Sequence, residues 1–128
     1  PIAIIEKQRL GNEDRVEAVN LIGSVEGKTA LIVDDEIDTG GSVVAAAKLL
    51  KEHGAVDVYC CAIHAILSGT AHQRLEKSVL KEIVVTDTLP IPKDKHIPNL
   101  KILSVAPILG EAIHRIHSGL SVGAMFDH

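Results

Sequence analysis

The sequence predicts a three-layer α/β domain in which helices cover both faces of a mostly parallel sheet. β-Rich runs alternate with amphipathic stretches along the chain, and the connections are long enough for parallel crossovers. Aromatic residues make up only 2% of the 128 residues, so Val, Ile, Leu and Ala must fill the core. That composition suits strands that are buried on both faces. The length fits one compact domain.

The expected elements follow from hydrophobic periodicity and from turn residues. Strands are expected at residues 2–5, 29–33, 56–67, 80–86 and 101–105, and helices at 43–53, at 68–77 and from Pro107 to Gly119. The first helix should bury Val43, Ala46, Ala47 and Leu50, and the last Leu109, Ala112, Ile113 and Ile116. The polar stretch 6–15 predicts a mobile loop, and three prolines make 87–99 a second loop.

Composition excludes several classes of protein. A net charge of -4 argues against a dedicated nucleic-acid binder, which carries a basic face. No apolar run is long enough to cross a bilayer, so no membrane partner is expected. Cys60 and Cys61 are neighbours in an expected strand and point to opposite faces, which predicts buried free thiols. These features together favour the cytoplasm.

The strongest chemical signal is the run from Asp34 to Ser42, which joins an expected strand to an expected helix. Ligands of open α/β sheets bind beyond the carboxyl ends of the strands. Gly40 and Gly41 allow backbone N–H groups to converge on an anion, and the helix N-terminus adds further donors. Thr39 and Ser42 could add hydroxyl groups, and Ser42 could also cap the helix. This donor cluster suits a phosphate.

The carboxylates in the same run suit a different part of the ligand. Asp34 and Asp35 would repel a phosphate, so they are expected to face neutral hydroxyl groups, from which carboxylates accept hydrogen bonds. They could also hold Mg²⁺ directly or through water. Asp38 lies nearer the expected phosphate and should orient the turn through backbone hydrogen bonds. A phosphate at one end and vicinal hydroxyls at the other describe a pentose phosphate.

Simpler interpretations exist for each of these residues. Gly40, Gly41 and Ser42 taken alone fit an ordinary turn with a serine cap, because short glycine motifs occur often by chance. Only the complete run between a strand and a helix favours a ligand site. The seven histidines have no partners at metal-ligand spacing. His64, inside an apolar run, is expected to be a hydrogen-bonded core or interface residue.

Residues 33–42 resemble the phosphoribosyl-diphosphate (PRPP) binding motif, which type I phosphoribosyltransferases share with ribose-phosphate pyrophosphokinases. The flanking segments are similar to the pyrophosphokinases in order and spacing, across essentially the whole chain. These segments are residues 6–9, 18–23, 25–28, His64 with 68–69, 84–90, 104–109, 111–116 and 121–126.

The resemblance implies a type I phosphoribosyltransferase-like fold and an enzyme that transfers pyrophosphate from ATP to ribose 5-phosphate, forming PRPP and AMP. It implies Mg²⁺ as cofactor and a homo-oligomer, a hexamer in the full-length family. Lys7 and Arg9 would be the catalytic pair on a loop that closes over the phosphates. The residues implied in binding ribose 5-phosphate are Arg9, Asp34, Asp35, Asp38, Thr39, Gly40, Gly41 and Ser42. Ser42 stands where the family often has threonine, and Ile63 and Thr70 also depart from its pattern.

The chain begins at Pro1 within a strand-like run, so residues 1–128 are expected to form the C-terminal domain of a longer two-domain protein. The resemblance places the ATP-binding segments and the main Mg²⁺ ligands upstream, with Asp34 and Asp35 as indirect contacts, so this piece alone should be inactive. Two alternatives stay open. A type I phosphoribosyltransferase would need a base-recognition hood that no segment supplies. A non-catalytic regulatory homologue is disfavoured because Lys7, Arg9 and the acidic run are retained.

Overall fold

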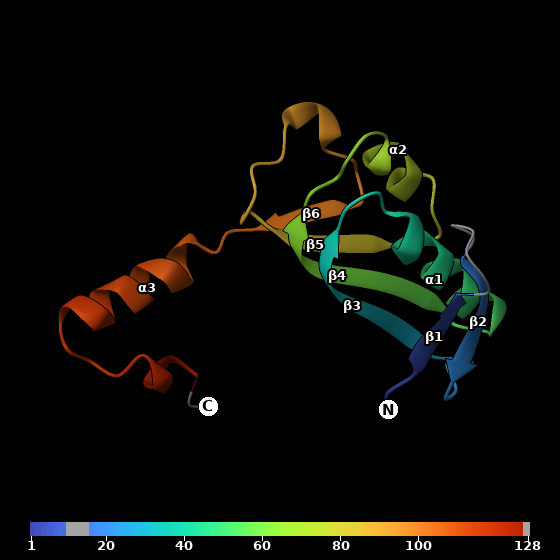
Figure 1. Ribbon diagram of the computed structural model, residues 1–128, viewed down its shortest axis with the longest axis horizontal. Helices are drawn as coiled ribbons and strands as arrows, with labels where there is room; N and C mark the ends of the chain where they lie inside the picture. The colour runs from blue at the N-terminus through green and yellow to red at the C-terminus, as the bar shows by residue number, and fades with distance from the viewer. Residues whose placement is uncertain (10–15, 127–128) are drawn as a thin grey trace.

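The computed structural model of the chain describes residues 1–9 and 16–126, with only the backbone described for residues 7–9 and 16–19. A parallel sheet of four strands in the order β3-β4-β5-β6 forms its centre. Its strands are β3 (Thr29–Ile37), β4 (Asp57–Ala65), β5 (Glu82–Thr86) and β6 (Leu100–Leu103). The remaining elements are β1 (Ile4–Arg9), β2 (Val16–Ile22), α1 (Gly41–Glu52), α2 (Ala71–Glu76), η1 (Lys93–Lys95), α3 (Ala106–His117) and η2 (Gly123–Met125). The α/β class and the parallel sheet are therefore confirmed (Figure 1).

The hydrophobic core lies between one face of the sheet and the helices α1 and α2. On β4, Val58, Cys60 and Ala62 are buried, whereas Tyr59 and Cys61 between them are only half-buried. The expected inward residues of α1 are all buried: Val43, Ala46, Ala47 and Leu50. Ala71 and Leu75 of α2 join the same cluster. The periodicity therefore predicted the buried face of α1 correctly.

The other face of the sheet is not covered by α1 or α2. It exposes apolar side chains from three strands, with Leu31 and Val33 on β3 at 61% and 73% exposure. Ile63 on β4 and Leu103 on β6 are about half exposed as well. Helices were expected on both faces of the sheet, but α1 and α2 both cover the same face. Both faces are apolar, as the composition indicated, but one of them is open.

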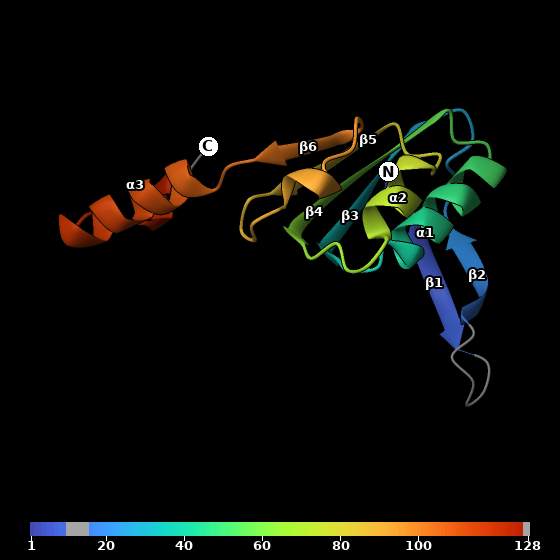
Figure 2. The ribbon, with the colours of Figure 1, turned by 90° about the horizontal axis from the view of Figure 1, so that it is seen from above.

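Helix α3 extends away from the sheet (Figures 1 and 2). None of its residues is buried, and Ile113 and Ile116 are 67% and 69% exposed. The prediction that its apolar residues face a core of this chain is therefore wrong. The amphipathic pattern correctly predicted a helix, but α3 makes no extensive contact with another described element. No helix among residues 1–9 and 16–126 is long and apolar enough to cross a bilayer.

The N-terminal region forms a hairpin in which β1 and β2 pair antiparallel, with Lys7 opposite Val19 and Arg9 opposite Val16. The loop expected over 6–15 is therefore wrong for residues 6–9, which belong to β1, while residues 10–15 lie outside the described part. Strand β2 had no counterpart among the expected elements. Residues 6–9 are polar, and their strand structure comes from pairing with β2, whose own residues Val16–Ile22 are mostly apolar.

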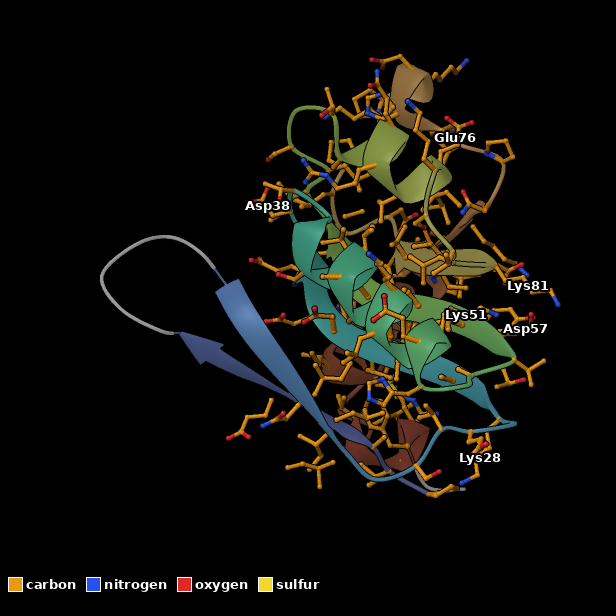
Figure 3. All side chains as sticks on the ribbon, turned by 90° about the vertical axis from the view of Figure 1, so that its right-hand side faces the viewer. Lys28, Asp38, Lys51, Asp57, Glu76 and Lys81 are labelled. Carbon is orange, nitrogen blue, oxygen red and sulfur yellow. The ribbon has the colours of Figure 1, made fainter. Side chains whose placement is uncertain are left out.

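Charged side chains stabilise the amino ends of the strands, on the side of the sheet opposite to Asp38 (Figure 3). Lys81 contacts the carboxylate of Asp57 at 2.8 Å, joining the start of β4 to the segment before β5. This hydrogen bond raises the pKa of Lys81. Lys51, near the end of α1, donates to the carbonyl of Val56 at 2.7 Å. The amino ends of the strands are thus closed by structural contacts, and the carboxyl ends carry the candidate site.

Burial predicts different reactivities for the two cysteines. Cys60 has no exposed surface, and this burial, with smaller contributions from Cys61 and Asp34, raises its pKa to about 12. Because the thiolate is the nucleophile, Cys60 should resist iodoacetamide at pH 8 in the folded chain. Cys61, which is half-buried, should be modified first. Peptide mass spectrometry over time, with and without urea, measures both rates. Equal rates in the folded chain would contradict the assignment.

Candidate functional site

The candidate site lies where β3 ends and α1 begins. A cavity of about 310 Å³ is lined by ten consecutive residues, from Asp34 to Val43. β3 extends to Ile37, which is buried, so Asp34, Asp35 and Glu36 lie on the strand and not in a turn. Asp38 and Thr39 follow as exposed residues, and Gly40 turns the chain into the helix. The segment singled out in the sequence therefore forms one hollow.

Gly40 allows this reversal because it adopts a left-handed conformation, with φ at 72°. A side chain here would be strained by that φ value. It would also meet Leu75, whose Cγ and Cδ2 atoms lie 3.3 Å from the position of an added Cβ. Gly40 is the N-cap residue and no side chain caps the helix, so the expected capping role of Ser42 is wrong. Ser42 instead lies in the first turn of α1.

Backbone and hydroxyl donors gather at the helical end of the hollow. The bond from Val44 N to Gly40 O, at 3.1 Å, begins the helical pattern. The N–H groups of Gly41, Ser42 and Val43 therefore have no acceptor within the helix. Thr39 and Ser42 are exposed and line the same hollow. Free N–H groups at a helix N-terminus, together with hydroxyls, form a favourable environment for an anion.

The strand end of the hollow carries the carboxylates. One oxygen of Asp34 accepts from the N–H of Asp35 at 3.0 Å, and one of Asp35 accepts from the N–H of Glu36 at 2.9 Å. The second oxygen of each carboxylate can accept from a ligand. Among the described residues the Asp38 carboxylate has no hydrogen bond. The backbone carbonyl of Asp38 accepts a hydrogen bond from the N–H of Ser68 at 3.0 Å. The backbone of Asp38, and not its side chain, thus holds the turn.

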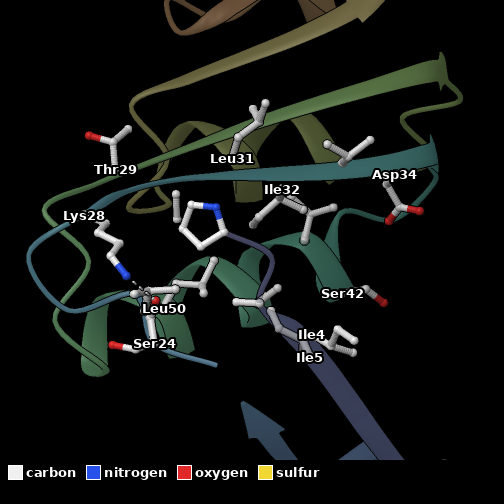
Figure 4. A pocket seen from close by; sticks show the side chains of 17 residues that line it. Ile4, Ile5, Ser24, Lys28, Thr29, Leu31, Ile32, Asp34, Ser42 and Leu50 are labelled. Carbon is white, nitrogen blue, oxygen red and sulfur yellow. Dashed lines mark hydrogen bonds between the residues drawn. The ribbon is translucent and has the colours of Figure 1, made fainter. Parts of the chain in front are cut away.

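A larger hollow of about 750 Å³ adjoins this one and is lined mainly by apolar residues of the N-terminal segment, β3 and α1. Figure 4 shows Asp34 and Ser42 at one end of it, with Ile4 and Ile5 along its floor. Asp34, Ser42 and Val43 line both hollows. The polar hollow therefore opens onto an apolar one at the carboxylate of Asp34.

Lys7 and Arg9, the expected catalytic pair, lie in β1, where only the backbone is described. The side chains of Lys7 and Arg9 lie outside the described part of the chain. Their assignment stays a prediction.

His64 is exposed at the end of β4, where its Nδ1 lies 2.9 Å from the hydroxyl of Thr88. The hydroxyl of Thr86 donates to the carbonyl of Ile63 at 2.7 Å and lies 3.1 Å from the hydroxyl of Thr88. His64 is thus hydrogen-bonded, as expected, though at the surface and not in the core. The described residues contain no group of three or more His, Cys, Asp or Glu side chains that could hold a metal ion.

Asp87, just after β5, organises the start of α3. Its carboxylate accepts from the N–H of Val105 at 2.8 Å. Hydrogen bonds from the side chain of Ser104 and then from Val105 hold the pKa of Asp87 below its usual value. No sequence motif predicts this role of Asp87, because its partners Ser104 and Val105 lie 17 and 18 residues away.

Comparison with known proteins explains this combination of features. Residues 10–127 match the family model of the phosphoribosyl synthetase-associated domain. The chain belongs to this family. Ribose-phosphate pyrophosphokinases are similar to it, with 52% identity to that of Caldanaerobacter subterraneus subsp. tengcongensis and 51% to that of Nostoc sp.. Each alignment covers 98% of this chain and 40% or 38% of the relative.

The fold comparison agrees with the sequence comparison. A crystal structure of phosphoribosylpyrophosphate synthetase from Mycobacterium smegmatis superposes with a TM-score of 0.84 at 42% identity. The match covers 93% of this chain and 37% of that one. The family assigned from the sequence is therefore confirmed, and the chain spans about 40% of the length of the relatives that it matches.

Sequence reasoning missed residues outside the acidic run that contact it. Arg74 of α2 donates to the carbonyl of Thr39 at 2.6 Å. Ile66 and Leu67 both donate to the carbonyl of Ile37, at 3.1 and 3.0 Å. No local motif predicts these contacts, because they join segments about 30 residues apart in the sequence.

Gly40→Ala tests the geometry of the turn in this phosphoribosyl synthetase domain. The substitution should lower the free energy of unfolding because of the left-handed φ, which costs about 1–2 kcal/mol, and because of the contact with Leu75. Gly27→Ala is a matched control, since Gly27 has φ 67° and nothing within 4 Å of an added Cβ. Urea denaturation should show a larger loss for Gly40→Ala. Equal losses would mean that Leu75 does not restrict this position.

Proposed function

We propose that this chain supplies the ribose 5-phosphate site of a ribose-phosphate pyrophosphokinase. The complete enzyme transfers the pyrophosphoryl group of ATP to the anomeric hydroxyl of ribose 5-phosphate, and forms PRPP and AMP. The observation that carries this proposal is the hollow of residues 34–43, which has phosphate donors at one end and carboxylates at the other. The family of the chain supports the same reaction.

In the proposed complex the 5-phosphate binds at the helical end. The N–H groups of Gly40, Gly41 and Ser42 and the hydroxyls of Thr39 and Ser42 donate to its oxygens. The positive end of the α1 dipole adds to this attraction. Because these donors belong to one short turn fixed between a strand and a helix, they need little rearrangement to bind the phosphate.

The sugar lies toward the strand end. Asp34, Asp35 and Asp38 offer carboxylate oxygens to its hydroxyl groups, and a hydrogen bond to a charged group is worth about 1.5–3 kcal/mol. The carboxylates also exclude a second phosphate from this end by repulsion. The two ends therefore orient the sugar and direct the anomeric carbon away from the helix.

Lys7 and Arg9 complete the proposed site. Both lie on β1 of the hairpin, and Ile4 and Ile5 of the same strand line the hollow next to Asp34. Two cations would stabilise the charge that spreads over phosphoryl oxygens during transfer. We assign Lys7 to the transferred group, and Arg9 to that group and to ribose 5-phosphate.

Mg²⁺ is the proposed cofactor of the complete enzyme. This ion is commonly held by one or two carboxylates with substrate phosphates and water, which Asp34 and Asp35 could provide, directly or through water. When bound with ATP, it neutralises charge on the phosphoryl groups. The described residues offer no fuller set of ligands, so we propose that the main ligands come from outside this chain.

We further propose that residues 1–128 are the C-terminal domain of a longer two-domain chain. The 40% coverage of the relatives supports this, as do the exposed apolar residues of α3 and of the open sheet face. The complete protein would bind ATP through its other segments, assemble as a homo-oligomer and act in the cytoplasm. We propose no nucleic-acid or membrane partner. The domain alone should bind ribose 5-phosphate weakly and make no PRPP.

An assay of the full-length protein tests the activity. With ATP, Mg²⁺ and ribose 5-phosphate, AMP and PRPP should form in equal amounts, measured by chromatography. Ribose without the phosphate should give much less product, because the donors of the turn have no partner. A folded full-length protein that binds ribose 5-phosphate but forms no AMP would instead indicate a non-catalytic homologue.

Asp38→Ala tests the site itself. Removing the carboxylate should weaken ribose 5-phosphate binding about tenfold, equivalent to about 1.4 kcal/mol, as measured by calorimetric titration of the full-length protein. Glu76→Ala serves as control, because Glu76 is an exposed carboxylate at the end of α2 that does not line the hollow. Equal affinities in wild type and Asp38→Ala would rule out the assignment.

A further inference from the structure

The segment between β4 and the end of α2 forms hydrogen bonds to the turn of residues 37–40, where the 5-phosphate is proposed to bind. Ile66 and Leu67 donate to the carbonyl of Ile37, and Ser68 donates to the carbonyl of Asp38 at 3.0 Å. Arg74 donates to the next carbonyl, that of Thr39, at 2.6 Å. Three successive carbonyls of the turn, residues 37–39, are thus fixed by one segment.

The backbone of this segment is strained where it meets the turn. Leu67 is the only residue other than glycine with a positive φ in the described part of the chain, at 51°, and its side chain is 1% exposed. Such strain persists only where surrounding contacts impose it. Here the two bonds to Ile37 and the burial of the Leu67 side chain impose it. The segment is therefore shaped to fit the turn.

Arg74 controls the orientation of one peptide group. The described part of the chain has no cis peptide bond, so the carbonyl of Thr39 and the N–H of Gly40 point in opposite directions. Arg74 and Leu75 contact the turn from the α2 side and do not line the hollow. A carbonyl held toward α2 therefore directs the Gly40 N–H toward the hollow, where the phosphate is proposed to bind.

The charge of Arg74 strengthens this effect. No described carboxylate lies within ion-pair distance of Arg74, and its guanidinium donates to the Thr39 carbonyl. A cation on a carbonyl polarises the peptide and makes its N–H a better donor. The guanidinium also adds positive potential behind the phosphate position.

We propose that Arg74 is a positioning residue for the 5-phosphate of the substrate, acting through the Thr39–Gly40 peptide without touching the ligand. This inference rests on the proposed function and extends it to a residue outside the acidic run. Arg74 sets the affinity for the phosphate group and has no part in binding ATP.

The test compares variants of the full-length protein. Arg74→Met should raise the KM and the Kd for ribose 5-phosphate about tenfold, with the KM for ATP and the thermal midpoint close to wild type. Arg74→Lys keeps the charge and one donor and should recover part of the affinity. Lys77→Met removes an equal charge from the end of the same helix and should bind like wild type, because no contact joins Lys77 to the turn.

The outcomes separate the two proposals. Unchanged ribose 5-phosphate affinity in Arg74→Met, with a wild type that binds, would overturn the role of Arg74 alone. Parallel changes in both KM values and in the thermal midpoint would show a general structural role and would also overturn it. An equal loss in Lys77→Met would reduce the effect to long-range charge. A wild type that does not bind ribose 5-phosphate would overturn the site and this inference together.

Discussion

The left-handed turn at Gly40, held against Leu75, is the constraint on which the site depends. It ends β3 and starts α1 within four residues, so carboxylates of the strand and N–H groups of the helix face one hollow. A wider turn would separate these two groups of atoms. Because Leu75 is fully buried in the core that α1 and α2 share, the shape of the turn is coupled to the packing of the domain.

Much of this arrangement could be predicted because it is local in sequence. The burial of Val43 and Leu50 follows from helical periodicity, and the hollow is made by ten consecutive residues. The end of β3 was placed too early because Asp34 and Glu36 have low strand propensity. Their strand conformation comes from pairing with Ala62 and His64 on β4, and such backbone pairing does not depend on side-chain type.

The contacts that hold the turn could not be predicted for the opposite reason. Arg74 meets Thr39 across 35 positions, and its neighbours in the sequence give no sign of this contact. Leu67 would be expected to prefer an ordinary φ value, and the bonds to Ile37 together with the burial of Leu67 explain its conformation. A binding motif can thus be recognised from its own residues, whereas the residues that give it a fixed shape require the tertiary structure.

Composition correctly predicted apolar residues on both faces of the sheet. It did not predict that one face and the apolar side of α3 would be exposed. The strands carry apolar residues on both faces, as a three-layer domain requires, and α3 carries Ile113 and Ile116 on an amphipathic helix. Within the described residues only one sheet face is covered. Apolar patches of this kind mark contact surfaces, and single residues such as Val33, at 73% exposure, gain about 1.5–3 kcal/mol from burial. The open face and α3 are therefore the candidate contact surfaces among the described residues of this chain.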